Sequence, residues 1–134
     1  MNISGKCDYA CRAMVELAAR YDRSIPVSAQ LIAEQRAIPE KYLTHILLQL
    51  KRSELVRSMR GAQGGYVLAK HPSAITLLHI IEAIDGPVLA PANSEQHEMH
   101  AFWQEITDEV GGVLSMYTLE KILEMTSKST MFHI

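Results

Sequence analysis

The chain has 134 residues, 48% hydrophobic and 21% charged, which fits one globular domain, alone or with an appendage, and excludes wholesale disorder. It contains no run of about eighteen apolar residues that could span a bilayer, and Cys7 and Cys11 are too few for a secreted disulfide framework. We therefore expect a cytoplasmic protein with no membrane contact.

The net charge of −2 hides an asymmetry along the chain. Residues 1–71 contain 11 Lys and Arg against 6 Asp and Glu, a net charge of +5. Residues 72–134 contain 2 against 9, a net charge of −7. The basic half suggests a module that binds a polyanion, although chance combined with ordinary solvation explains the charges equally well at this point.

The first predicted helix covers residues 7–21, where apolar residues recur at helical spacing. Its stripe consists of Ala10, Ala13, Met14, Leu17, Ala18 and Tyr21. A loop follows at residues 22–26, and Ser28 is a suitable N-cap for a short second helix. This short helix, the turn after it and the amphipathic third helix described next form a helix-turn-helix pattern.

A third helix is predicted to start at Pro39, because proline suits the first helical position. The helix buries one apolar face and exposes the other side, so it is amphipathic. The buried residues are Leu43, Ile46, Leu47 and Leu50. The exposed residues are Glu40, Lys41, Thr44, His45, Leu48 and Arg52.

Two short strands are predicted next, at residues 55–59 and 66–68, on either side of the glycine-rich turn Arg60-Gly61-Ala62-Gln63-Gly64-Gly65. A helix-turn-helix followed directly by such a hairpin predicts a winged helix. The glycines do not form a phosphate-binding loop, because Tyr66 and a strand follow them instead of Lys-Ser/Thr and a helix.

The second half is predicted to be helical. Thr76 caps a fourth helix that ends at Asp85-Gly86-Pro87, with Gly86 in the left-handed conformation. After a loop at 87–94, a fifth helix runs from about Glu95 into the 110s, and Thr118 caps a last helix. The apolar stripe of the fifth helix is either intramolecular core or a dimer seam, and we favour the seam. It comprises Met99, Phe102, Trp103, Ile106 and Val110.

These residues together resemble a known family. The pattern comprises Asp8-Tyr9-Ala10, Ile38-Pro39-x-x-Tyr42-Leu43, Leu50, Leu55-Val56, Arg60-Gly61-x-x-Gly64-Gly65-Tyr66-x-Leu68 and Ile81-x-Ala83-Ile84-Asp85-Gly86. It is similar to the Rrf-type family of bacterial winged-helix transcription regulators, which includes IscR-, NsrR- and CymR-like proteins. The resemblance extends from residue 1 to about residue 125, and the wing is its most specific part.

The resemblance implies a homodimer that binds a palindromic site in double-stranded DNA. In this family the third helix enters the major groove, the wing reaches the adjacent minor groove, and the long C-terminal helices cross to form the dimer. The implied DNA-binding residues lie at the start of the second helix, on the third helix and on the wing. They are Ser28, Pro39, Lys41, Tyr42, Thr44, His45, Arg52, Arg60, Gly61 and Ala62.

The chain departs from the family at the iron–sulfur site that many members form with three cysteines between the fourth and fifth helices. There is no cysteine after Cys11, so that site cannot form and we expect no cofactor. His97 and His100 are weak candidates for a metal site, because two ligands are too few. Cys7 and Cys11 are weak candidates for a redox pair, and we expect them to be packed instead.

The fold expected is mainly α with a small β-hairpin wing, and with a long C-terminal dimerisation helix. Residues 1–86 are predicted to form a winged helix-turn-helix DNA-binding domain, and residues 87–134 the loop and dimerisation helices. We predict a DNA-binding transcriptional regulator, a repressor that answers to an effector metabolite or a partner protein. The alternatives are an interaction module that has lost DNA binding and, more remotely, a metal- or redox-dependent enzyme. No catalytic grouping such as Ser-His-Asp stands out.

Overall fold

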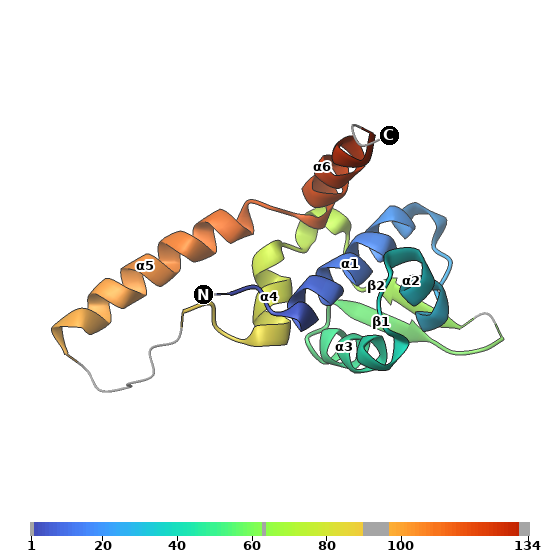
Figure 1. Ribbon diagram of the computed structural model, residues 1–134, viewed down its shortest axis with the longest axis horizontal. Helices are drawn as coiled ribbons and strands as arrows, with labels where there is room; N and C mark the ends of the chain where they lie inside the picture. The colour runs from blue at the N-terminus through green and yellow to red at the C-terminus, as the bar shows by residue number, and fades with distance from the viewer. Residues whose placement is uncertain (1, 63, 90–96, 132–134) are drawn as a thin grey trace.

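A computed structural model describes residues 2–62, 64–89 and 97–131, with side chains to residue 127. The fold is mainly helical with one two-stranded hairpin, as predicted (Figure 1). The helices are α1 (Gly5–Ala19), α2 (Ala29–Arg36), α3 (Glu40–Arg52), α4 (Leu77–Asp85), α5 (Glu98–Ser115) and α6 (Leu119–Met131); the strands are β1 (Val56–Met59) and β2 (Gly65–Leu68). Short 3-10 turns cover Tyr21–Arg23 and Pro72–Ala74. No helix in these ranges is long and apolar enough to cross a membrane.

Helix α1 runs through the centre of the fold and packs against α2, α3, α4 and α6. It begins two residues earlier than predicted, because the Ser4 hydroxyl accepts a hydrogen bond from the Cys7 amide and caps the helix. It also ends earlier, at Ala19, where the chain tightens into the 3-10 turn. The largest fully buried side chains are Met14, Ile32, Leu43, Ile46, Leu47, Leu50, Ile75, Ile80 and Leu119.

Helices α2 and α3 form the predicted helix-turn-helix. Ser28 caps α2 as expected, and the turn passes through Ala37 in the left-handed region to the buried Ile38. The prediction that Pro39 is the first helical residue is wrong by one position. Pro39 has an extended ψ of 125° and is the N-cap, and its carbonyl oxygen accepts from the amides of Tyr42 and Leu43. The four predicted core residues of α3 are buried.

The hairpin is joined to the helices by backbone hydrogen bonds. β1 and β2 pair antiparallel. Tyr66 also forms a backbone bridge with Val27, in which the two N to O distances are 2.8 and 2.9 Å. This close approach requires glycine at position 65, where a Cβ atom would lie 2.4 Å from the Val27 carbonyl oxygen. Gly61 at the tip has a φ of +120°, which side chains rarely adopt. The base of the wing is therefore fixed to the loop before α2.

Thr76 caps α4 as predicted, but Gly86 after it has φ 82° and ψ −163°. It therefore has a positive φ without being in the left-handed helical region, and that detail of the prediction is wrong. The predicted start of the fifth helix at Glu95 lies outside the described residues; α5 starts at Glu98 after His97 as N-cap and continues through Gly111 and Gly112 to Ser115.

Helix α5 projects away from the rest of the molecule, and α6 starts at the body of the molecule and extends outward toward the C-terminus (Figure 1). A backbone bridge between Thr76 and Thr118 holds the start of α6 beside the start of α4, and the Thr118 hydroxyl caps α6 as predicted. Leu119 is fully buried and joins the core formed with α1. The core therefore lies among α1, α2, α3, α4 and the first turn of α6, whereas α5 has no buried residue and packs against the core only near its end, through Leu114.

Candidate nucleic-acid interface

The exposed side of α3 presents the residues that the sequence predicted. Lys41, Thr44 and His45 are exposed, and Leu48 lies beside them with a large part of its surface in water. The Thr44 hydroxyl donates to the Glu40 carbonyl oxygen at 3.2 Å, and its own oxygen can still accept a hydrogen bond. Short side chains of this kind suit contacts with base edges, including the thymine methyl group.

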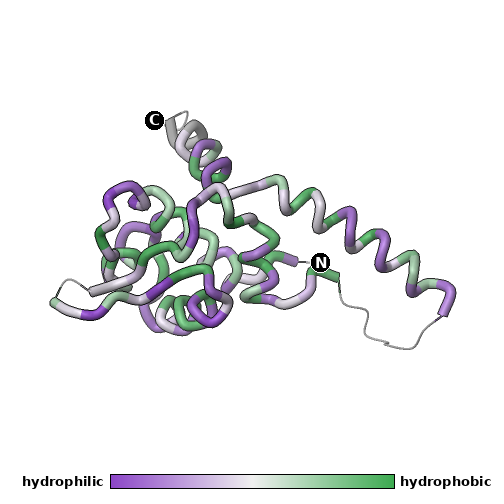
Figure 2. The backbone as a smooth tube through the Cα atoms, turned by 180° about the vertical axis from the view of Figure 1, so that it is seen from behind, coloured by the Kyte–Doolittle hydropathy of each residue, from purple (hydrophilic) through white to green (hydrophobic). Residues whose placement is uncertain are grey.

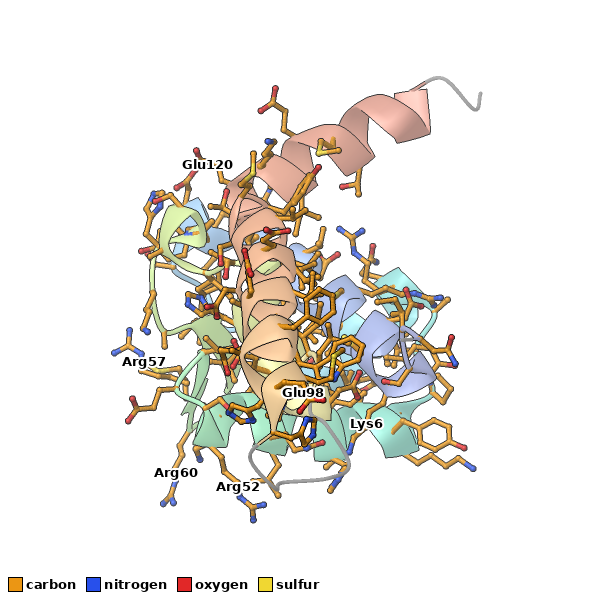
Figure 3. The ribbon with its side chains drawn as sticks, turned by 90° about the vertical axis from the view of Figure 1, so that its left-hand side faces the viewer. Lys6, Arg52, Arg57, Arg60, Glu98 and Glu120 are labelled. Atoms are coloured by element: carbon orange, nitrogen blue, oxygen red, sulfur yellow. The ribbon has the colours of Figure 1, made fainter. Side chains whose placement is uncertain are left out.

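The wing and the end of α3 are on one side of the molecule. Figure 3 shows Arg52 of α3 and Arg60 of the wing projecting from the same side, away from Glu120 of α6. Arg60, Gly61 and Ala62 are exposed. Neither guanidinium has an ion-pair partner within the described residues. A cationic side chain beside a narrow glycine turn has the shape and charge needed to enter a DNA minor groove.

An aromatic and basic cluster extends this side onto α1, and the sequence analysis missed it. Tyr9 of α1 stacks on Tyr42 of α3 with ring centroids 6.2 Å apart, and the Lys41 ammonium lies 5.0 Å from the Tyr42 ring centre. Beside them is a groove of about 520 Å³ lined by Gly5, Lys6, Tyr9, Tyr42 and His45. The signal in the sequence is Lys6, Tyr9 and Arg12 at three-residue spacing, which puts them on one helix face.

Two basic residues near this surface are already paired. Arg36 at the end of α2 donates from Nε to Glu16 Oε1 at 2.8 Å, and Arg20 donates to the other carboxylate oxygen. Burial alone would raise the pKa of Glu16. The hydrogen bonds from Arg20 and Arg36 lower the pKa by more than burial raises it, so the net pKa is below its ordinary value. These three residues hold α1 and α2 together.

Ser28 has a structural role and an exposed position. Its hydroxyl accepts from the Leu31 amide at 3.1 Å and caps α2. The start of α2 carries the free amides and positive dipole end that attract phosphate oxygens. The cap and the exposure of Ser28 are observed, and its contact with DNA stays a prediction.

The predicted dimer residues lie on α5, in a separate part of the molecule. Phe102 is 46% exposed and Trp103 is 42% exposed, and their rings meet edge to face with centroids 5.2 Å apart. Met99 is also exposed, and Ile106 and Val110 are partly buried. Figure 2 shows hydrophobic and hydrophilic residues alternating along this projecting helix.

The weaker candidates for a metal site and for a redox pair lie on different helices. His97 is the N-cap of α5, where its Nδ1 accepts from the Met99 amide at 3.1 Å, and His100 is exposed one turn later. The described residues include no group of three or more His, Cys, Asp or Glu side chains that could hold a metal. Cys7 is buried as expected, whereas Cys11 is partly buried rather than fully packed, because it lies at the edge of the apolar stripe.

The comparisons with known proteins agree with this geometry. The Rrf2 family model, an iron-dependent transcriptional regulator by its description, matches residues 3–125. The chain belongs to the Rrf2 family of transcriptional regulators. It is thus a DNA-binding protein of the helix-turn-helix class, as the sequence predicted, and this favours DNA binding over a degenerate interaction module.

Two curated relatives and one solved structure illustrate the similarity. The chain is 36% identical to the HTH-type transcriptional regulator CymR of Bacillus subtilis, over the full length of both chains. It is 31% identical to the regulator IscR of Photorhabdus laumondii, covering 92% of this chain and 79% of IscR. The structure of B. subtilis CymR, the global cysteine regulator, superposes with a TM-score of 0.78 at 35% identity, covering 93% of this chain and 98% of CymR.

The iron in the family description does not fit the residues of this chain. Iron–sulfur clusters are held mainly by thiolates, usually four per cluster. This chain has two cysteines, and both are in the first three turns of α1. The loop between α4 and α5, where cluster-binding members of the family have three cysteines, has none.

Proposed function

We propose that this regulator is a cluster-free homodimer that represses transcription by binding a palindromic operator through α3 and the wing. The observation that carries the proposal is the combination of two exposed surfaces on one chain. One is the basic and aromatic side formed by α1, α3 and the wing, and the other is the apolar face of α5. The first suits DNA and the second suits another copy of the chain.

The dimer proposal rests on the surroundings of α5. None of its residues is buried, and its packing within the chain is against α4. A helix that leaves Met99, Phe102 and Trp103 in water has an exposed apolar patch that a monomer rarely keeps. Symmetric pairing of two such helices covers the same patch on both chains, as a two-fold interface requires. Residues 87–134 then supply the dimerisation part, and residues 1–86 the DNA-binding part.

Each DNA-facing residue receives a role from its chemistry. Thr44, His45 and Tyr42 of α3 face base edges in the major groove, while Lys41 and Arg52 neutralise phosphates on either side. Pro39 and Ser28 place the starts of α3 and α2 next to the DNA backbone. Arg60, with Gly61 and Ala62 keeping the tip thin, enters the minor groove.

The groove on α1 adds a backbone contact to this set. Lys6 is partly buried at its edge, and no described side chain forms an ion pair with it. Arg12 contributes less, because it is paired with Asp8 at 2.6 Å. We assign Lys6 and Tyr9 to the sugar–phosphate backbone outside the recognition helix.

In this proposal a small metabolite or a partner protein controls the regulator. The regulator acts by binding, without a catalytic step. The chain has no residues for a resident cluster. The structure of one relative, CymR, carries the description of a global cysteine regulator. Control through a ligand or a protein is therefore the consistent choice.

The experiment that tests the proposed function is selection of bound sequences from random duplex DNA with the purified full chain. Enrichment of one palindrome, with half-sites spaced by a helical turn, is the expected result. A pool that stays random after repeated rounds, with a protein that is folded and dimeric, would contradict sequence-specific binding.

A further inference from the structure

The two cysteines of the chain form a pair inside the first turns of α1. Cys7 is 1% exposed, and Cys11 lies one helical turn later and is partly buried. Positions 7 and 11 share one face of α1, and the interaction between the two thiols is the largest influence on the pKa of each. The proposed DNA-binding function uses neither thiol, although the neighbouring Lys6 and Tyr9 belong to it.

The geometry of the pair is unsuited to a disulfide. Side chains at positions i and i+4 of a helix have Cβ atoms about 6 Å apart, whereas a disulfide needs a separation of about 4 Å. Closing that bond would unwind the turn of α1 that Ser4 caps. A metal ion between two sulfurs needs more room, because thiolate–metal bonds near 2.3 Å give a linear sulfur–metal–sulfur span of about 4–5 Å.

The chemistry of the two thiols also disfavours an oxidant sensor, which needs an ionised and accessible sulfur. The hydrogen bond from Cys11 lowers the pKa of Cys7, against the effects of burial, Asp85 and Asp8, but this sulfur is enclosed. Cys11 is the less buried of the two residues, but its pKa is raised far above its ordinary value. The causes are the same hydrogen bond, burial, Cys7 and the two carboxylates. The thiol with the lowered pKa is therefore the buried one, and the less buried thiol is the one with the raised pKa.

We propose that Cys7 and Cys11 bind one copper(I) ion per chain in a linear two-sulfur site. Thiolates are soft ligands that select copper(I), and this ion is stable with two of them, whereas zinc in proteins takes four ligands. No third His, Cys, Asp or Glu completes a larger metal group in the part of the chain that the structure describes. Binding replaces the two thiol protons by one Cu⁺, so two protons leave and the site changes from neutral to a charge of −1.

The test is an anaerobic titration of the reduced full chain with copper(I) held by the chromogenic chelator bicinchoninate. The wild-type chain is expected to take one copper(I) per chain from the chelator. Cys11→Ser and Cys7→Ala are each expected to lower that affinity by about 100-fold or more, since losing even an outer-shell partner of a metal site costs up to that much. Circular dichroism establishes that each variant is folded.

A matched control is the double variant His97→Ala/His100→Ala, which removes the other cluster of potential ligands on α5 and should bind copper as the wild type does. X-ray absorption of the wild-type complex requires no variant and should show two thiolate sulfurs as the neighbours of the metal. The proposal is overturned if the wild-type chain leaves the chelator's copper untouched. It also fails if Cys7→Ala/Cys11→Ser retains wild-type affinity, or if the metal has mainly nitrogen neighbours.

Discussion

Glu16 is the single charged side chain that is buried among the described residues, at 6% exposure. It connects α1 to the end of α2 through Arg36 and to its own helix through Arg20. Because the pairing lowers the pKa of Glu16, the folded state holds this carboxylate ionised more strongly than the unfolded chain does. The stabilisation is therefore present above the ordinary pKa of 4.5 and is lost as pH falls through the lower folded-state pKa.

Glu16→Gln is accordingly expected to lower the free energy of unfolding by about 1–3 kcal/mol at pH 7, because two charge-assisted hydrogen bonds lose their acceptor charge. The difference from wild type should shrink below pH 4.5. Urea denaturation between pH 3 and pH 7 measures both quantities. Asp8→Asn is the control: its pair with Arg12 is about half exposed and should contribute about 0.5 kcal/mol or less. An equal difference at pH 3 and pH 7 would show that Glu16 acts by packing alone.

Arg60 is the residue on which the DNA-binding proposal depends most. Arg60→Ala is expected to weaken operator binding by about 1–3 kcal/mol per wing and to reduce the A·T preference at the outer flanks. Arg57→Ala provides the control, because Arg57 lies on β1 of the same hairpin but projects to a different side (Figure 3). Titrations at several salt concentrations should show a shallower salt slope for the Arg60 variant. Equal losses for both variants would mean that the wing contributes only general positive charge.

At the scale of elements, the hairpin depends on a contact with the loop before α2. Gly65→Ala should lower the free energy of unfolding by about 1–3 kcal/mol, because the added Cβ meets the Val27 backbone and not a movable side chain. Gly112→Ala should have the opposite sign and stabilise by about 0.5–1 kcal/mol, since it lies inside α5 with open space around it. Thermal or urea unfolding of both variants checks the signs. A neutral Gly65→Ala would mean that the bridge between Val27 and Tyr66 opens readily.

Local patterns in the sequence predicted the helices and the hairpin, because periodicity and capping operate within a few residues. The buried face of α3, the Ser28, Thr76 and Thr118 caps and the glycine turn were all predicted in this way and are confirmed. The contacts that could not be predicted join distant residues. Arg36 meets Glu16 across 20 positions, and Tyr9 stacks on Tyr42 across 33. No spacing rule within one helix specifies such pairs.

Helix ends were less predictable than helix faces. Proline at position 39 satisfies both the N-cap and the first helical position, and the choice depends on ψ, which the turn after Ala37 sets. Similarly, the start of α1 depends on Ser4, whose hydroxyl also donates to Asp85 of α4. Such ends are decided by tertiary contacts that the linear pattern does not contain.

At the scale of the whole molecule, the proposed dimer depends on the apolar face of α5. Phe102→Ala and Trp103→Ala are each expected to weaken dimerisation by about 2–4 kcal/mol, because buried aromatic anchors dominate interface energies. Gln104→Ala, whose amide bonds Asp108 on the polar side of α5, should leave the dimer unchanged. Sedimentation equilibrium over a range of low concentrations measures the dissociation constants. Unchanged dimers for both aromatic variants would place the seam elsewhere.

The charges of the chain are distributed unevenly over the molecule. Arg52 at the end of α3 and Arg60 of the wing face away from Glu120 of α6 (Figure 3). A negative surface repels DNA, so this separation orients the molecule with α3 and the wing toward the duplex. In a dimer, the same separation holds for both copies.

The most direct test of the central claim is hydroxyl-radical footprinting of the full chain on its selected operator, compared with the Arg60→Ala variant. The wild-type protein should protect two patches related by a dyad, with centres about one helical turn or a multiple of it apart. Outer minor-groove protection should disappear in the variant on both sides while the inner protection at the α3 half-sites remains. A single unsymmetric patch, or outer protection that survives the loss of Arg60, would contradict the two-fold reading of DNA by α3 and the wing.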